Sequence, residues 1–399
     1  MPAALPDWAV WRADPARPAW TVGIEEEVML LDPRDWRLAH VMDELLPELS
    51  PGLAEKVSAE THACTLELET GVHTTVAGAV AELSALRTSL AEELRPLGLA
   101  AAAAGTHPLA VGEETEVSGS ARYQVLEDGL RALARREPTF ALHVHVGVPI
   151  AELAMAAADR LRAQLPLLLA LSANSPYWRG GDTGLASMRS ALFQAFPRAG
   201  LPRHFESYPR YVETIDALLR ADAFPEPTFI WWDVRLQPRF GTVEVRIMDA
   251  QSRLQDVGAL TALIQSLVRL LSTERLVADE LLDAQEALEE NRFIASRDGM
   301  AAEFIDPLRS VRIPAVEQLE SILSSCRTHA RDLECRNELE AVSALAEQPG
   351  ATRQRALAED GSVPDVAGAL AGMFLSEPSP EDLAAVTGGL RDSHLDPSP

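Results

Sequence analysis

Four segments of the chain alternate apolar and polar residues with the two-residue period of a half-buried β-strand. They are TVGIEEEVML (21–30), CTLELETG (64–71), ALHVHVGV (141–148) and GTVEVRIMD (241–249). Because side chains two apart share a face of a strand, each segment has one apolar face that suits a core. We therefore predict four strands of which one face is buried.

The opposite faces of these strands carry an unusual set of side chains. In chain order they are Glu25 and Glu27, Glu67 and Glu69, His143 and His145, and Glu244 and Arg246; Glu26 interrupts an apolar face. One glutamate pair is usually just a solvated face, but four strands with this pattern favour a site. If the faces converge, the carboxylates need cations to offset their repulsion and desolvation. Oxygen ligands with an imidazole favour Mg²⁺ or Mn²⁺, so we predict a metal-bearing cavity.

Helical spacing and buried runs predict most other elements. These are a helix over 77–98, a buried strand within 99–110, a long buried helix over 150–174, a strand pair within 228–249, and helices over most of 255–345. Residues 175–210 are rich in Gly, Pro, Ser and aromatic residues and lack periodicity, which is typical of functional or mobile regions.

The 399 residues, 47% of them hydrophobic, can build a substantial core. We predict an irregular Pro-rich segment over 1–18, a single folded domain over 19–375, and a disordered tail over 376–399. A net charge of −25 argues against nucleic-acid or anionic-membrane partners.

Phosphate chemistry, if present, must use arginine. Lys56 is the only lysine among the 35 basic residues, and no phosphate-binding loop motif occurs. Arginine forks suit bidentate phosphate or carboxylate contacts.

The cysteine content and the N-terminal sequence favour a reduced compartment. Cys64, Cys326 and Cys335 form no C-x-x-C motif, and residues 1–20 lack the features of a secretory signal. The apolar run 165–173 is too short to span a bilayer. We expect a soluble, cytoplasmic protein.

Several longer motifs give the chain a family resemblance. GIEEE, LELETGVH, HVHVGVP, LLALSANSPYWRGGDTGLASMRS, WWDVRLQPRFGTVEVRIMDAQ and ENRFIASRDGM, spread over residues 20–310, resemble the type 2 glutamate–cysteine ligases, or carboxylate–amine ligases. That resemblance implies an α+β, glutamine-synthetase-like catalytic domain, a curved antiparallel sheet with helices on one face. It also implies ATP-dependent amide formation through an acyl phosphate, with glutamate and cysteine yielding γ-glutamylcysteine for glutathione biosynthesis.

The resemblance also implies roles for individual residues. The implied metal ligands, for Mg²⁺ or alternatively Mn²⁺, are Glu25, Glu27, Glu67, His143 and Glu244. His145 is expected to contact the nucleotide, Arg246 the transferring phosphoryl group, and Arg239 a second phosphate position. Glu244, Arg246 and Arg239 form the expected catalytic set.

The remaining candidates have two interpretations each. Arg189 would clamp a substrate carboxylate or be an ordinary solvated arginine, and Asn174 would bind substrate or cap a helix. Glu69 is a weaker ligand or a salt-bridge partner. His73 lies near the site or packs a turn, and Cys64 is a buried thiol. Of the adjacent Trp231 and Trp232, one is expected in the core and the other at the pocket. The loop glycines Gly180, Gly181 and Gly184 suit either closure over the site or simple turns.

Two other functions compete with the ligase. A guanidino-kinase-like phosphotransferase would use the same arginines without acyl transfer, and a nucleotide- or metal-binding regulator would bind without turnover. A ligase acting on another acid and amine is a further alternative. The expected partners are amino-acid substrates, and a homodimer is compatible with the sequence.

Overall fold

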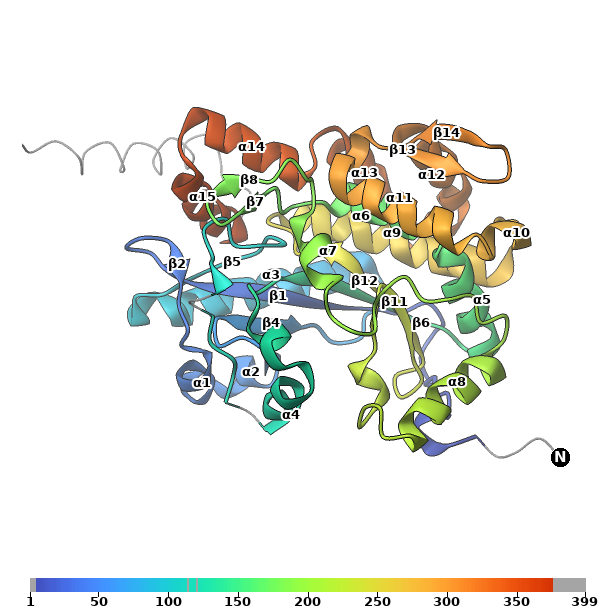
Figure 1. Cartoon of the computed structure of the whole chain (residues 1–399), viewed down its shortest axis with the longest axis horizontal. Helices are drawn as coiled ribbons and strands as arrows, with labels where there is room; N and C mark the ends of the chain where they lie inside the picture. Colours follow the sequence, from blue (N-terminus) through green and yellow to red (C-terminus); the bar gives the residue numbers. More distant parts are fainter. Residues whose placement is uncertain (1–4, 113–114, 120, 376–399) are drawn as a thin grey trace, which may run out of the picture.

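The computed structural model describes residues 5–112, 115–119 and 121–375, so the predicted tail lies outside the described residues. Its largest element is an 8-stranded antiparallel sheet in the order β11-β12-β6-β1-β4-β3, with β2 and β5 also pairing with β1 (Figure 1). The strands are β1 (Val22–Asp32), β2 (Arg37–Leu38), β3 (Val57–Ala59), β4 (Thr65–Glu69), β5 (Ala100–Ala102), β6 (Ala141–Gly147), β11 (Val234–Gln237) and β12 (Thr242–Asp249). The four predicted strands are confirmed as β1, β4, β6 and β12, which are consecutive neighbours in this sheet.

Helices cover the apolar face of the sheet, where α3, α6 and α9 contact its central strands. In Figure 1, α6 and α9 lie above the sheet, together with α11, α12 and α13, while α1, α2, α4 and α8 lie below it. The helices are α1 (Met42–Leu45), α2 (Pro51–Ala54), α3 (Val76–Leu94), α4 (Ala121–Leu130), α5 (Ala151–Leu161), α6 (Leu165–Ser172), α7 (Met188–Phe193), α8 (Tyr208–Arg220), α9 (Leu254–Thr273), α10 (Asp279–Leu282), α11 (Gln285–Asp298), α12 (Ala315–Asp332), α13 (Arg336–Glu347), α14 (Gly350–Asp360) and α15 (Val363–Leu375).

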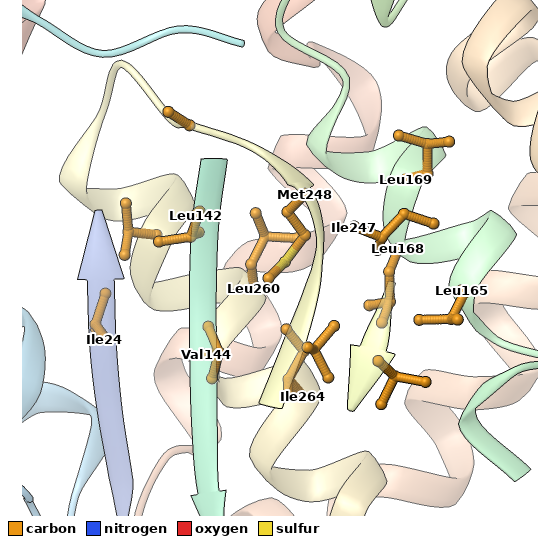
Figure 2. Close-up of a cluster of buried hydrophobic side chains, with 14 of the residues drawn as sticks. Ile24, Leu142, Val144, Leu165, Leu168, Leu169, Ile247, Met248, Leu260 and Ile264 are labelled. Atoms are coloured by element: carbon orange, nitrogen blue, oxygen red, sulfur yellow. The ribbon is translucent and has the colours of Figure 1, made fainter. Parts of the chain in front are cut away.

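The alternating apolar residues of the strands form the centre of the core. Figure 2 shows buried side chains of β1, β6 and β12 facing those of α6 and α9. The labelled residues are Ile24, Leu142, Val144, Ile247 and Met248 from the strands, with Leu165, Leu168, Leu169, Leu260 and Ile264 from the helices. This packing leaves the glutamates and histidines on the opposite face.

Glu26, which interrupts the apolar face of β1, is fully buried and paired with Arg87 of α3. Arg87 Nε donates to Glu26 Oε2 at 2.7 Å, and the guanidinium also donates to the carbonyls of Gln251, Ser252 and Phe374. A buried carboxylate is tolerated when its charge is paired and its hydrogen bonds are made. This pair therefore ties α3 and the end of α15 to the sheet.

The pairing of β12 with β6 contains a bulge beside Arg246. The register passes from Val245–Val144 to Met248–Leu142, so three steps on β12 span two on β6. The predicted alternation of β12 holds as far as Arg246 and then breaks. Bulges re-aim side chains and are common next to functional sites.

One prediction of secondary structure is wrong. The single helix over 150–174 is divided into α5 and α6 because Pro166 stands in the first turn of α6, where a proline ends an incoming helix. In the break, the buried Arg162 donates to the carbonyls of Pro202 and Leu282. The prediction of helices over most of 255–345 is confirmed; the region also contains a hairpin, β13 (Glu303–Asp306) and β14 (Val311–Pro314).

The irregular region 175–210 holds only short elements besides α7: β7 (Tyr177–Trp178), β8 (Gly181–Asp182) and β9 (Ala199–Gly200), which pairs with β10 (Trp231–Trp232). Its glycines provide turns. Arg179 and Gly180, both at positive φ, form the tip of the β7–β8 hairpin. Closure of this loop stays a prediction.

Helix α9 is long and apolar enough to cross a membrane by length and composition alone. However, 83% of its most apolar window is buried inside the structure. This burial is typical of a core helix, and α9 packs between the sheet and α12 and α13.

Candidate functional site

The strand register brings the predicted site residues together on the face of the sheet opposite α9. Glu25 of β1 stands opposite His143 of β6, and Glu27 stands opposite Glu67 of β4. Glu244 of β12 stands opposite His145. Cross-strand neighbours have Cβ atoms roughly 4.5–5.5 Å apart, so four strands gather these side chains into one cluster.

Two groups of side chains in this cluster are close enough to share an ion. One contains Glu25, His143 and Glu244, and the other contains Glu27, Glu67 and His143; within each group the potential ligand atoms lie within 4.8 Å of one another. His143 is central to both. Its Nδ1 lies 3.3 Å from Glu25 Oε2 and 3.5 Å from Glu67 Oε1, and its Nε2 lies 3.7 Å from Glu27 Oε1. The five predicted metal ligands are thus the members of these two groups.

The carboxylates of the cluster differ in how their charge is balanced. Burial and the nearby charges of Glu25 and Glu60 raise the pKa of Glu67 well above its ordinary value. Burial also raises the pKa of Glu25, but the imidazoles of His145 and His143 outweigh it and hold that pKa far below the usual range. A divalent ion would remove the repulsion around Glu67, which is the requirement that the strand pattern predicted.

Glu244 is fully buried and is held by two arginines and an amide. Arg235 Nε donates to Glu244 Oε2 at 2.6 Å and Gln237 Nε2 donates to the same oxygen at 2.7 Å, while Arg246 Nη1 donates to Oε1. Burial raises the pKa of Glu244, but Arg235 and Arg246 hold it well below its ordinary value. An ion bound by Glu244 would have to take over part of this contact with Arg246.

Sequence reasoning missed Arg235 and Gln237. The run Val234-Arg235-Leu236-Gln237 alternates in the same way as the four recognised segments, and its polar side chains face Glu244. Period-two alternation alone could have found them.

His145 lies beside the metal-ligand cluster. Its Nδ1 is 3.0 Å from Thr242 Oγ1 and its Nε2 is 3.1 Å from Glu25 Oε1. Burial lowers the pKa of His145, but Glu25 and Glu244 outweigh it and raise that pKa above its ordinary value. A cationic imidazole here suits an anionic ligand.

Two cavities meet at this cluster, and Glu25, Glu69 and Phe240 line both. The first cavity, of about 670 Å³, is lined by His145 and Arg239 and by backbone from several glycine-containing turns, and the segment 12–19 also contributes. The second cavity, of about 460 Å³, contains the predicted ligands Glu27, Glu67 and His143. The exposed Arg239 lies over the ring of Phe240, with its Cζ 5.7 Å from the ring centroid.

The second cavity has acidic, imidazole and aromatic walls that the strand pattern did not reveal. Trp231 lines it, whereas Trp232 packs on Phe205 in the core with ring centroids 5.5 Å apart. His62 also lines it, and burial lowers the pKa of this imidazole to about 4. Glu137, another wall residue, accepts from Arg179 Nε at 2.8 Å.

Glu69 lies at the site, whereas His73 lies outside it. Glu69 stands opposite Glu25 in the register and lines both cavities, and among the described residues no lysine or arginine pairs with it. His73 instead contacts Glu82, with Nε2 2.6 Å from Oε2, and packs a turn outside both cavities.

The geometry does not favour substrate contacts for Asn174 and Arg189, which line neither cavity. The Asn174 amide is fully buried and donates to Ala250 O at 2.8 Å and to Ser252 Oγ at 3.1 Å. Arg189 is buried behind the bulge of β12 and donates to the carbonyls of residues 246 and 247. Sequence spacing placed both near a glycine-rich loop but could not show which way they point.

Cys64 has no reactive setting. It is buried, and burial raises the pKa of its thiol to about 12. A thiol with so high a pKa is an inert core residue, as predicted.

Comparison with known proteins gives a consistent result. Residues 21–372 match the family model described as glutamate-cysteine ligase family 2. The chain is 39% identical over 341 residues to a Rubrobacter xylanophilus protein provisionally named glutamate–cysteine ligase 2-1, covering 85% of this chain and 90% of that one. It is 37% identical over 339 residues to a similarly named Gloeobacter violaceus protein, covering 84% and 91%.

Solved structures show a similar fold. A glutamate–cysteine ligase from Francisella tularensis, solved in complex with AMP, superposes with a TM-score of 0.67 at 13% identity, over 94% of this chain and 92% of that one. A bifunctional glutathione synthetase from Pasteurella multocida gives a TM-score of 0.66 at 14% identity, over 90% of this chain and 52% of that one. The predicted α+β fold class is confirmed.

Proposed function

The chain belongs to glutamate–cysteine ligase family 2, and on this premise we propose that it is an ATP- and Mg²⁺-dependent carboxylate–amine ligase joining the γ-carboxylate of glutamate to the amino group of cysteine. One observation carries the proposal beyond the family. Two groups of potential metal ligands sharing His143 stand where two cavities meet. This layout suits a reaction between a nucleotide phosphate and a carboxylate, because bound metals would then have one substrate on each side.

The proposed reaction has two steps. A γ-carboxylate oxygen of glutamate attacks the γ-phosphorus of ATP, the bond to the bridging oxygen breaks, and ADP leaves. The amino group of cysteine then attacks the carbonyl carbon of the acyl phosphate, and phosphate leaves as the amide forms. Phosphoryl transfer of this kind depends on positioning and on charge stabilisation rather than on a covalent group of the protein.

The residues present suit divalent ions. Carboxylate oxygens from Glu25, Glu27 and Glu67, together with the imidazole of His143, would hold them, and Glu244 would contribute after rearrangement of its contact with Arg246. Bound Mg²⁺ supplies charge neutralisation and orientation at the phosphate oxygens.

We assign the nucleotide to the 670 Å³ cavity and the amino acids to the 460 Å³ cavity. The larger cavity presents His145 and Arg239 together with glycine-rich backbone, which suits a polyphosphate. Besides the proposed metal ligands, the smaller one carries Glu60 and Glu137, which suit the ammonium groups of amino acids.

We infer that Arg246 contacts the transferring phosphoryl group. It lines the smaller cavity, and its Nη1 lies 3.3 Å from His143 Nδ1, between the two ligand groups. Its charge is secured, because Glu244 outweighs burial and raises the pKa of Arg246 further. A fork-shaped cation that cannot lose its proton suits the charge that develops on phosphoryl oxygens.

The test is ADP release measured with glutamate and cysteine, each alone and together, in the presence of Mg²⁺, with the product identified by mass spectrometry. We expect γ-glutamylcysteine, and ADP release that depends on both amino acids. Transfer of ¹⁸O from labelled glutamate to phosphate tests the acyl phosphate. ADP release with a phosphorylated guanidine product would instead indicate the phosphotransferase, and nucleotide binding without turnover would indicate the regulator.

A further inference from the structure

The segment 7–19 contributes part of the wall of the larger cavity through its residues after Trp11, although the match to the family model begins only at residue 21. Apart from the three-residue 3₁₀ turn η1 (Asp7–Ala9), this strap has no regular secondary structure. Its residues 12–15 and 17–19 line the cavity that we assign to the nucleotide. This wall is thus built by a part of the chain that the family match does not include.

The strap is fixed to the body of the protein at several points. The indole Nε1 of Trp11 donates to Val148 O at 2.8 Å, and its ring packs edge-on against Tyr208 with centroids 6.0 Å apart. The backbone amide of Arg12 donates to Pro238 O at 2.8 Å. These bonds hold the strap against the turn 238–241 that precedes β12.

The approach of the strap to this turn requires a glycine. Gly241 has φ +65°, and a Cβ atom at this position would lie 2.7 Å from Ala13 Cα and Ala13 N. A close approach at positive φ is a position that only glycine fills without strain. The turn and the strap are therefore shaped to fit one another, and the turn carries Arg239 into the same cavity.

Arg12 is the one basic residue of the strap whose guanidinium forms no polar contact with another described residue. It lines the cavity, and no hydrogen bond or ion pair holds its guanidinium in residues 5–112, 115–119 and 121–375. In contrast, Arg17 Nε lies 3.2 Å from Asp14 Oδ2, so its charge is already matched. An unpaired guanidinium in a cavity with His145 and Arg239 favours an anion.

We propose that Arg12 binds phosphate oxygens of the nucleotide and that residues 7–19 position it, so that the strap is a nucleotide-binding element of this protein. The inference rests on the proposed function, because it places ATP in the larger cavity. It deepens that function by naming a phosphate contact outside the family match. This contact would contribute to the affinity for the nucleotide and would take no part in the chemical steps.

The test compares Arg12→Ala and Arg12→Lys with the unaltered protein. Isothermal titration calorimetry with Mg²⁺ and the β,γ-imido analogue of ATP measures affinity, and adenosine serves as a ligand without phosphate. A charge-assisted hydrogen bond to phosphate predicts roughly tenfold weaker binding of the analogue by Arg12→Ala, a smaller loss for Arg12→Lys, and no change for adenosine. In steady-state assays KM for ATP should rise while KM for glutamate stays constant.

The matched control is Arg34→Ala, which removes the same charge. Arg34 is exposed, pairs with Asp32, and lies outside both cavities. We expect this variant to bind the analogue as the unaltered protein does. An equal loss in the control would assign the effect to net charge and overturn the specific contact.

A second variant tests the strap itself. Trp11→Ala removes the anchor from Val148 and Tyr208, and the indole does not line the cavity. We expect weaker binding of the analogue, and a double variant with Arg12→Ala that is no weaker than the weaker single variant, because both changes remove one interaction. Additive losses would show that the strap does not act through Arg12.

Three outcomes with the Arg12 variants also overturn the inference: unchanged affinity in Arg12→Ala, an equal loss for adenosine, or a rise in KM for glutamate instead of ATP. Failure of the proposed function would look different. In that case the unaltered protein itself would bind no analogue with Mg²⁺ or release no ADP, whatever stands at position 12.

Discussion

The substitution Glu244→Gln separates the structural from the catalytic role of the most buried carboxylate in the site. The side chain keeps its size and one oxygen, but it loses the negative charge that Arg235 and Arg246 share. Since Glu244 is 0% exposed, water cannot replace that charge. We expect loss of stability and loss of turnover, in proportions that can be measured independently.

The size of the stability loss depends on the hydrogen-bond partners that Arg235 and the new glutamine keep. Removing one partner of a buried ion pair costs about 3–5 kcal/mol. Here Arg235 keeps acceptors in Thr228 O and Ile230 O, at 3.0 and 2.9 Å, and the glutamine keeps one carbonyl oxygen, so we expect about 2–3 kcal/mol. An unfolding entropy of about 2.1 cal/mol/K per residue amounts to about 0.8 kcal/mol/K for 399 residues, so Tm should fall by about 3 °C. Turnover should fall about 100-fold or more, because Arg246 loses the carboxylate that holds it.

The assay pairs differential scanning calorimetry with ADP release at a temperature where the variant is folded. The control is Glu26→Gln, which breaks the pair with Arg87 on the other face of the sheet and should lower Tm similarly while leaving kcat unchanged. If Glu244→Gln lowers Tm and keeps normal turnover, Glu244 is structural only. An unchanged Tm would refute the argument that the charge of Glu244 stabilises the protein by pairing with Arg235 and Arg246.

Three further predictions concern neighbouring residues. Arg246→Lys should lower kcat by about 100-fold, measured by ADP release, since the point charge of a lysine cannot both donate to Glu244 and make the proposed contact with the phosphoryl group. Asn174→Ala should lower the free energy of unfolding by about 2–3 kcal/mol in chemical denaturation, because the buried amide donors of Asn174 and its acceptor for Gln354 are lost. KM for glutamate should stay unchanged, and a raised KM would support a role of Asn174 in substrate binding. Because burial and the neighbouring carboxylates raise the pKa of Glu67, protons should compete with Mn²⁺ for it at a higher pH than for an ordinary glutamate. Calorimetric Mn²⁺ affinity should therefore rise with pH, with proton release on the acid side of that pKa, and Glu67→Gln should bind more weakly and without that pH dependence.

The sequence predicted that these side chains share one face, because this depends only on the two-residue period of a strand and on the residue types along it. Side chains two apart share a face, so Glu25, Glu27 and His143 had to point away from the core once their neighbours pointed into it. The same rule would have found Arg235. Strand order could not be derived this way, because pairing partners far apart in sequence leave no mark in the local pattern.

The residues whose orientation the sequence could not give lie outside the long periodic elements. Asn174 follows the end of α6 and Arg189 lies in the first turn of the short helix α7, where the sequence is too short for a period to tell which side faces the cavity; tertiary hydrogen bonds decide it. The strap at 7–19 looked merely irregular because a segment without periodic burial can still be held by a few specific bonds, such as that of Trp11. The break before Pro166 was visible in the sequence, since proline limits where a helix can continue.

The three consecutive glutamates of β1 lie on two faces of the sheet, and their charges are balanced differently on each face. Glu26 faces the helices and is matched by Arg87, a fixed counterion that ties elements together. On the other face, among the described residues, no arginine or lysine forms an ion pair with Glu25, Glu27 or Glu67. Fixed cations there would block the ligand oxygens. The imidazoles balance Glu25, whereas the repulsion around Glu67 stays unrelieved, and this repulsion would favour the exchangeable divalent ion that we propose.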